Sequence, residues 1–103
     1  ILHFNWNNAP SGLKRISLSE NNLSHFTWDL TPPGLKEIWM SGNQISYFNW
    51  NNAPSGLEEI YLDGNNLINF TWKGCPPTLK EIGLADNKLT HFNWEGLIWM
   101  VIT

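Results

Sequence analysis

Apolar and polar positions recur along the chain with a period of 22 residues. The most regular of them are a phenylalanine and the tryptophan two residues after it, which return in every period. These residues are Phe4, Phe26, Phe48, Phe70 and Phe92, with Trp6, Trp28, Trp50, Trp72 and Trp94. A fixed period of this length is typical of stacked repeats, so we expect residues 22 positions apart to lie over one another along a coil.

Each period also contains a short stretch in which apolar and polar residues alternate. In the second period, Ile38 and Met40 alternate with Glu37, Trp39 and Ser41, which is typical of a strand with one buried face. The equivalent strands are expected around Ile16, Ile60 and Ile82. Strands that recur in one direction must pair in parallel, because the rest of each period returns the chain. The pattern predicts a repeat solenoid with strands on one side.

A polar column stands between the apolar ones. It consists of Asn21, Asn43, Asn65 and Asn87. Where the chain turns off each strand, backbone groups lose their ladder partners, and an amide side chain can both donate to and accept from them. We therefore expect a structural ladder of asparagines that connects one period to the next.

Four segments of the chain share one spacing of apolar residues and asparagine. They are LKRISLSENNL, LKEIWMSGNQI, LEEIYLDGNNL and LKEIGLADNKL, and each resembles the L-x-x-I-x-L-x-x-N-x-L segment of leucine-rich repeats. The resemblance covers residues 1–96, about four and a half units. The short unit, with proline just ahead of the next leucine, is similar to the bacterial type found in secreted effectors and to the FNIP-type repeats of social amoebae.

This resemblance implies a solenoid of the α/β-class leucine-rich-repeat type, here mostly β and irregular. Its parallel sheet would line the concave face of an arc, where partners usually bind, and its convex side would be extended or turn-rich. Residues 97–103 leave the repeat as a short, uncharged, β-prone segment. We expect this segment to be a C-terminal cap strand over the last rung or a truncated end.

The outward positions of the predicted strands form the candidate partner-binding face. They are Arg15, Ser17, Glu37, Trp39, Ser41, Glu59, Tyr61, Asp63 and Glu81. Trp39 and Tyr61 stand one period apart, so their backbones should lie about 4.8 Å from each other on neighbouring strands. Two such rings favour an interface anchor. The alternative is mutual stacking that only stabilises the sheet.

The glutamates at positions 37, 59 and 81 form an acidic column beside these rings. Stacked like charges repel one another, and a basic partner would relieve that repulsion. The competing interpretation is that Lys14, Lys36 and Lys80, in the preceding column, neutralise the carboxylates in solution.

Composition excludes several classes of partner. A net charge of −3 with six basic residues does not provide the clustered cations that phosphates require, so we expect no nucleic-acid partner. No apolar run is long enough to span a bilayer, so we expect no membrane partner. The single cysteine, Cys75, cannot form an internal disulfide, which favours a reducing compartment such as the cytoplasm, or secretion as an effector.

The sequence contains no arrangement typical of catalysis. There is no Ser-His-Asp order, glycine-rich phosphate loop or Cys-x-x-Cys pair. His3 and His25 share a column, yet a third ligand is not evident, so we expect surface histidines rather than a metal site. The sequence thus predicts a protein–protein interaction module, part of a longer array, without cofactor or enzymatic activity. The alternative is a structural subunit whose uncapped repeat ends associate head to tail into a filament or particle.

Overall fold

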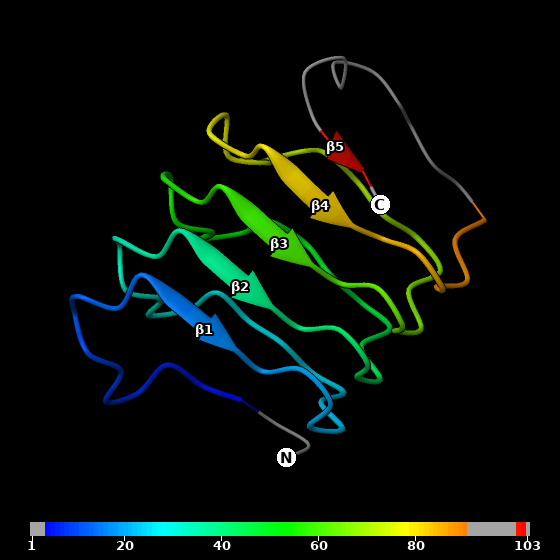
Figure 1. The fold of residues 1–103 in the computed structure, drawn as a ribbon, viewed down its shortest axis with the longest axis horizontal. Coiled ribbons are helices and arrows are strands. Elements are labelled where there is room, and N and C mark those ends of the chain that lie inside the picture. The colour runs from blue at the N-terminus through cyan, green and yellow to red at the C-terminus, as the bar shows by residue number, and fades with distance from the viewer. Residues whose placement is uncertain (1–3, 91–100, 103) are drawn as a thin grey trace.

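The computed structural model describes residues 4–90 and 101–102. This part of the chain contains five short strands and no helix: β1 (Arg15–Ser17), β2 (Glu37–Trp39), β3 (Glu59–Tyr61), β4 (Glu81–Gly83) and β5 (Val101–Ile102). The strands form one parallel sheet in chain order. Figure 1 shows them as the successive steps of a coil, each reached after one full turn of the chain.

The pairing register confirms the repeat. Ile16 pairs with Ile38, Ile38 with Ile60, and Ile60 with Ile82, so residues 22 apart lie on adjacent layers. The last step is shorter, because Ile82 pairs with Ile102. Most of the segment 97–103 lies outside the described residues, and Val101–Ile102 is the part of it that pairs with β4.

Two tight turns return the chain from one rung to the next. In the first, each Phe-x-Trp tryptophan accepts a hydrogen bond through its carbonyl from the residue three positions later, as from Ala9 to Trp6 and from Ala53 to Trp50 at 3.1 and 3.0 Å. In the second, a proline carbonyl accepts from a core leucine, as from Leu35 to Pro32 at 3.2 Å. These turns explain why every period carries a proline ahead of its leucine.

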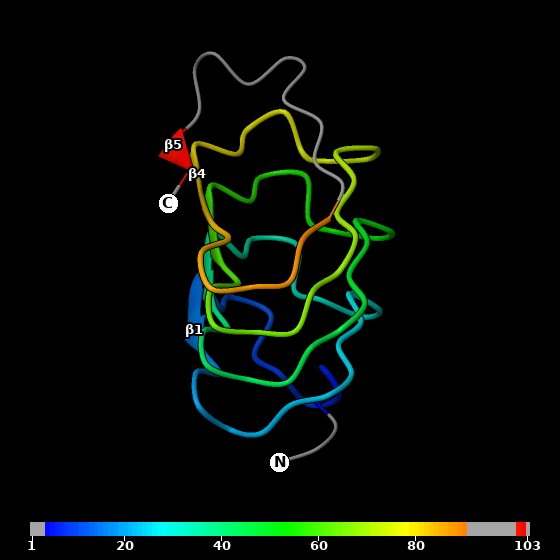
Figure 2. The same ribbon diagram turned by 90° about the vertical axis from the view of Figure 1, so that its right-hand side faces the viewer.

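The core lies between the sheet and the return segments, which Figure 2 shows on opposite sides of the coil. The isoleucines at the centres of β2, β3 and β4 are fully buried, as are the leucines of the second turn. Eighteen apolar side chains make up the buried cluster, which includes Trp6, Trp28 and Trp50. The Phe-x-Trp rings therefore point inward, as the period predicts.

The predicted asparagine ladder is present. The Oδ1 atom of Asn43 accepts hydrogen bonds from the backbone N–H groups of Asn21 and Leu23, both at 2.9 Å. Its Nδ2 atom donates to the carbonyls of Leu18 and Met40 at 2.9 and 3.0 Å. One side chain thus connects the turn of its own rung with the turn of the preceding one.

The other ladder asparagines repeat this arrangement. Asn65 accepts from the N–H of Ile45 at 3.0 Å, and Asn87 accepts from that of Leu67 at 3.0 Å. Asn43 and Asn65 are 5% and 4% exposed, whereas Asn21 and Asn87 are half-buried. The ladder is therefore fully enclosed on its two middle rungs.

A second ladder, of tryptophans, runs along the return side. The indole Nε1 atoms of Trp6, Trp28 and Trp50 donate to the carbonyls of Thr27, Asn49 and Thr71 on the following rung, at 2.9, 3.0 and 2.8 Å. The neighbouring phenylalanines pack edge-on against these indoles, with ring centroids 4.8 to 4.9 Å apart. Tryptophan therefore supplies apolar area and a hydrogen bond between rungs at the same position.

Candidate binding face

The strand residues alternate as predicted. In the second rung, Ile38 and Met40 are 0% exposed, whereas Glu37, Trp39 and Ser41 are half-exposed on the other side. We define the sheet face as the residues at the outward positions of four rungs. Row 1 is Lys14, Arg15, Ser17 and Ser19; row 2 is Lys36, Glu37, Trp39 and Ser41; row 3 is Glu58, Glu59, Tyr61 and Asp63; row 4 is Lys80, Glu81, Gly83 and Ala85.

Trp39 and Tyr61 stand at the middle of the sheet face. They are register partners in β2 and β3, their ring centroids are 6.1 Å apart and their planes differ by 7°. The rings stack on each other, and both also remain half-exposed. Stacking and exposure therefore occur together, so this pair stabilises the sheet and also presents aromatic surface to the outside.

The hydroxyl of Tyr61 is held by the acidic column. It donates to Oε1 of Glu59 at 2.7 Å. Burial raises the pKa of Tyr61 far above its usual value, and the hydrogen bonds and charges of Glu59 and Glu81 raise it further. Tyr61 is therefore a protonated, fixed donor on the face.

The cations of the face do not neutralise the acidic column evenly. Arg15 forms an ion pair with Glu37 through Nε and Oε2. Among the described residues, Lys80 is the only one of the three column lysines that approaches a carboxylate, with its Nζ 3.8 Å from Oε1 of Glu58. The interpretation that the lysines neutralise the glutamates 37, 59 and 81 therefore gains little from the geometry.

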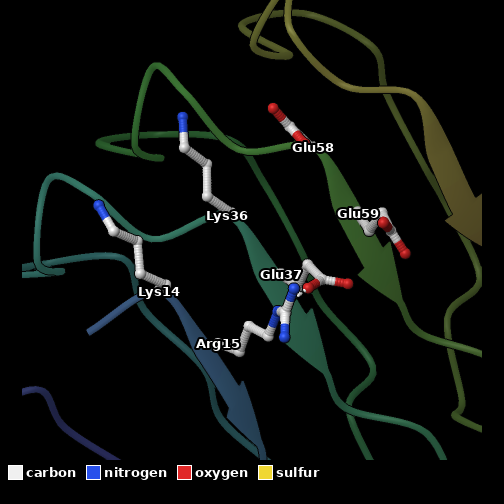
Figure 3. Close-up of a pocket in the computed structure, with 6 residues that line it drawn as sticks. All are labelled: Lys14, Arg15, Lys36, Glu37, Glu58 and Glu59. Carbon is white, nitrogen blue, oxygen red and sulfur yellow. Dashed lines mark ion pairs between the residues drawn. The ribbon is translucent and has the colours of Figure 1, made fainter. Parts of the chain in front are cut away.

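Lys14 and Lys36 instead extend over the glycines of the next rung. A Cβ atom added at Gly34 would lie 3.3 Å from Nζ of Lys14, and one at Gly56 would lie 2.9 Å from Nζ of Lys36. The absence of a side chain at these glycines leaves the space that the two lysine side chains occupy. Figure 3 shows both lysines extending to the same side of the strands.

These side chains surround an open groove of about 570 Å³ on the sheet face. It is lined by three cations and three carboxylates, which Figure 3 labels: Lys14, Arg15, Lys36, Glu37, Glu58 and Glu59. The charges are ordered, because the cations come from the first two rungs and two of the carboxylates from the third. Asp63 adds a further negative charge to the third rung, where it accepts a hydrogen bond from Ser41 at 2.9 Å.

The remaining reactive side chains lie off the sheet face. Burial raises the pKa of the Cys75 thiol to about 11, so this half-buried group stays protonated at neutral pH. His25 is exposed, with Nδ1 2.9 Å from the hydroxyl of Ser24, while His3 lies outside the described residues. Within residues 4–90 and 101–102, no cluster of three metal-ligating side chains occurs, and no helix is long and apolar enough to cross a membrane.

Most of the candidate residues were found from alternation alone, but three features were not. They are the ion pair of Arg15, the direction of Lys14 and Lys36, and the resulting groove. The glycines at positions 34 and 56, one period apart from each other, were the available signal, since a small residue leaves room for a long neighbour. A scan against models of protein families gives no match, and no curated protein is significantly similar in sequence.

Proposed function

We propose that this chain is a leucine-rich-repeat module that binds another protein through its sheet face, the concave side of an arc that forms part of a longer array. The assignment is supported by the way each L-x-x-I-x-L-x-x-N-x-L segment covers one three-residue strand and one ladder asparagine. The repeat subclass we favour is the short, effector-like or FNIP-like unit, on the strength of the 22-residue period and its proline. The role is binding rather than catalysis, and it requires no cofactor.

The observation that carries this proposal is the half-exposed stack of Trp39 and Tyr61 between charged rows. Large aromatic side chains bury much surface on binding and lose few rotamers, which is why they are enriched among the residues that dominate interface energies. Charged groups on both sides of the rings would set the orientation of the partner and exclude others.

The test is a double variant, Trp39→Ala with Tyr61→Ala, assayed by calorimetry against a partner captured with the intact chain. We expect the folded variant to bind at least about 100-fold more weakly, since loss of two anchor side chains costs about 3 kcal/mol or more. The matched control is Tyr47→Ala, because Tyr47 is 73% exposed and lies off the sheet face. Full affinity in a folded double variant would rule out the sheet face as the binding site.

A further inference from the structure

Row 1 and row 3 of the sheet face are complementary at every position. The cations Lys14 and Arg15 of row 1 stand in the same columns as the carboxylates of Glu58 and Glu59 in row 3. In the next outward column, row 1 has a small residue, Ser17, and row 3 has a large one, Tyr61. The last outward column has Ser19 in row 1 and Asp63 in row 3, a hydroxyl donor and a carboxylate acceptor.

Row 2 lies midway between these two rows. β1 and β3 pair with opposite edges of β2, so row 1 and row 3 are each one strand away from Trp39. A two-fold rotation about an axis parallel to the strands and passing over row 2 therefore exchanges the positions of row 1 and row 3. Such an axis generates an interface in which one surface meets a second copy of itself.

We propose that the partner of the sheet face is a second copy of this chain, docked face to face about this axis. The inference rests on the proposed function, because it uses the same face. Lys14 and Arg15 of each copy then lie opposite Glu58 and Glu59 of the other, which gives four pairs of opposite charge. Trp39 meets its own symmetry mate at the centre.

Shape complementarity supports the same arrangement. Sheets that pack face to face lie about 10 Å apart, so long side chains on one face must meet short ones on the other. The rotation places Tyr61 of each copy over Ser17 of the other, and Ser17 is exposed. It also brings the hydroxyl of Ser19 to the carboxylate of Asp63 on the second copy.

Other two-fold axes in the plane of the face pair like charges. An axis along the stacking direction sets every row against itself, so Glu59 meets Glu59 and Glu81 meets Glu81. An axis between rows 2 and 3 sets Lys14 against Lys80 and Glu37 against Glu59. Juxtaposed like charges disfavour both arrangements. Only the axis over row 2 opposes each charge of row 1 with the opposite charge in row 3.

The dimer should be weak and sensitive to salt. A typical interface takes about a tenth of a small protein's surface, here about 600 Å² of 6065 Å² on each copy. This is at the lower end for specific complexes, so we expect a dissociation constant in the micromolar to millimolar range. Since exposed charges are screened within about 10 Å at 0.1 M salt and 3 Å at 1 M, dissociation should become several-fold easier across that range.

The decisive experiment measures the mass of the whole chain by sedimentation equilibrium and repeats it with charge-reversed variants. One variant carries Lys14→Glu with Arg15→Glu, and the other carries Glu58→Lys with Glu59→Lys. We expect each alone to dissociate at least tenfold more readily than the unchanged chain. An equimolar mixture of the two should regain the dimer, because each then offers the charge that the other needs.

Two further variants keep the test independent of folding defects. Ser17→Phe fills the space that Tyr61 of the second copy would take, so it should abolish the dimer without altering charge. Lys73→Glu with Lys88→Glu alters charge at exposed positions off the face and should leave the dimer intact. Circular dichroism melting establishes that each variant is folded.

A monomer at every concentration up to about a millimolar, the upper limit expected for so small an interface, would overturn the inference. Failure of the mixed variants to associate would also overturn it. A monomer that still loses its affinity for a captured protein on Trp39→Ala with Tyr61→Ala would retain the proposed function and exclude only self-recognition.

Discussion

The inner side of each rung and the sheet face follow opposite rules. On the inner side, one column reads Ile16, Ile38, Ile60 and Ile82, with almost the same surroundings on every rung. On the sheet face, the adjacent column reads Ser17, Trp39, Tyr61 and Gly83. An inner residue packs against its own counterparts above and below, so a change must suit three layers at once. An outward residue meets solvent, so it can differ from rung to rung.

This difference separates the residues that specify the coil from those that can specify a partner. Columns that repeat supply burial and hydrogen bonds between rungs, which are the nearest-neighbour terms that stabilise a solenoid. The column that varies supplies shape and charge. Predictions about stability should therefore fall on the first set, and predictions about association on the second.

The largest expected contrast is between two neighbours on β3. Ile60→Ala removes a side chain that is 0% exposed, and we expect it to lower the free energy of unfolding by about 2 to 5 kcal/mol. Tyr61→Ala removes a larger but half-exposed side chain, and should cost less than about 1.5 kcal/mol, since it loses mainly ring stacking and one hydrogen bond. Urea unfolding of the two variants measures both values. Equal losses would show that the outward side of the sheet is as much a part of the core as the inner side.

The next effect concerns the asparagine ladder. Asn43→Ala leaves two backbone N–H groups and two carbonyls without the amide that bonds to them. We expect a loss of about 1 to 3 kcal/mol and a clearly lower melting temperature. Gln44→Ala is the matched control, because Gln44 is exposed and its backbone bond to Leu23 is kept. An unchanged melting curve for Asn43→Ala would refute the structural role of the ladder.

A smaller effect is expected from the tryptophan ladder. Trp28→Phe keeps an aromatic ring but removes the N–H that donates to the carbonyl of Asn49. The expected cost is about 1 to 2 kcal/mol, from the lost bond and part of the ring volume. Trp39→Phe, on the sheet face, should change stability by less than about 0.5 kcal/mol. If thermal unfolding finds the two substitutions equivalent, the indole N–H contributes nothing to the stacking of rungs.

The smallest effect is an expected gain in stability. Leu30 is 76% exposed and has a φ of 68°, in the left-handed region that a leucine side chain disfavours. The equivalent residues of other rungs are Asn8, Asn52 and Gly74, which tolerate that region. Leu30→Asn should therefore stabilise the chain by about 0.5 to 1 kcal/mol. The mirrored change, Asn8→Leu, should destabilise it, and a loss of stability in both variants would contradict this account of the turn.

Several features could be predicted from the sequence with confidence in their geometry. The parallel order of β1 to β4, the stacking of residues 22 apart and the pairing of Trp39 with Tyr61 all follow from the period. The bonds of Asn43 to the preceding rung follow from the need to satisfy backbone groups at a turn. A buried indole also needs an acceptor, so the bond from Trp28 to the next rung was within reach of the same reasoning.

What the amino-acid order determined by itself is therefore everything that repeats: which side chains face inward, which columns lie over one another and which rings meet on the outside. Only the tertiary structure decided how the long charged side chains of the sheet face are directed, that Arg15 pairs with Glu37, and that the lysines extend over Gly34 and Gly56. The physical reason is that burial leaves a core residue one position, set by the period. A flexible charged side chain near water has many positions of similar free energy, and its neighbours in space select among them.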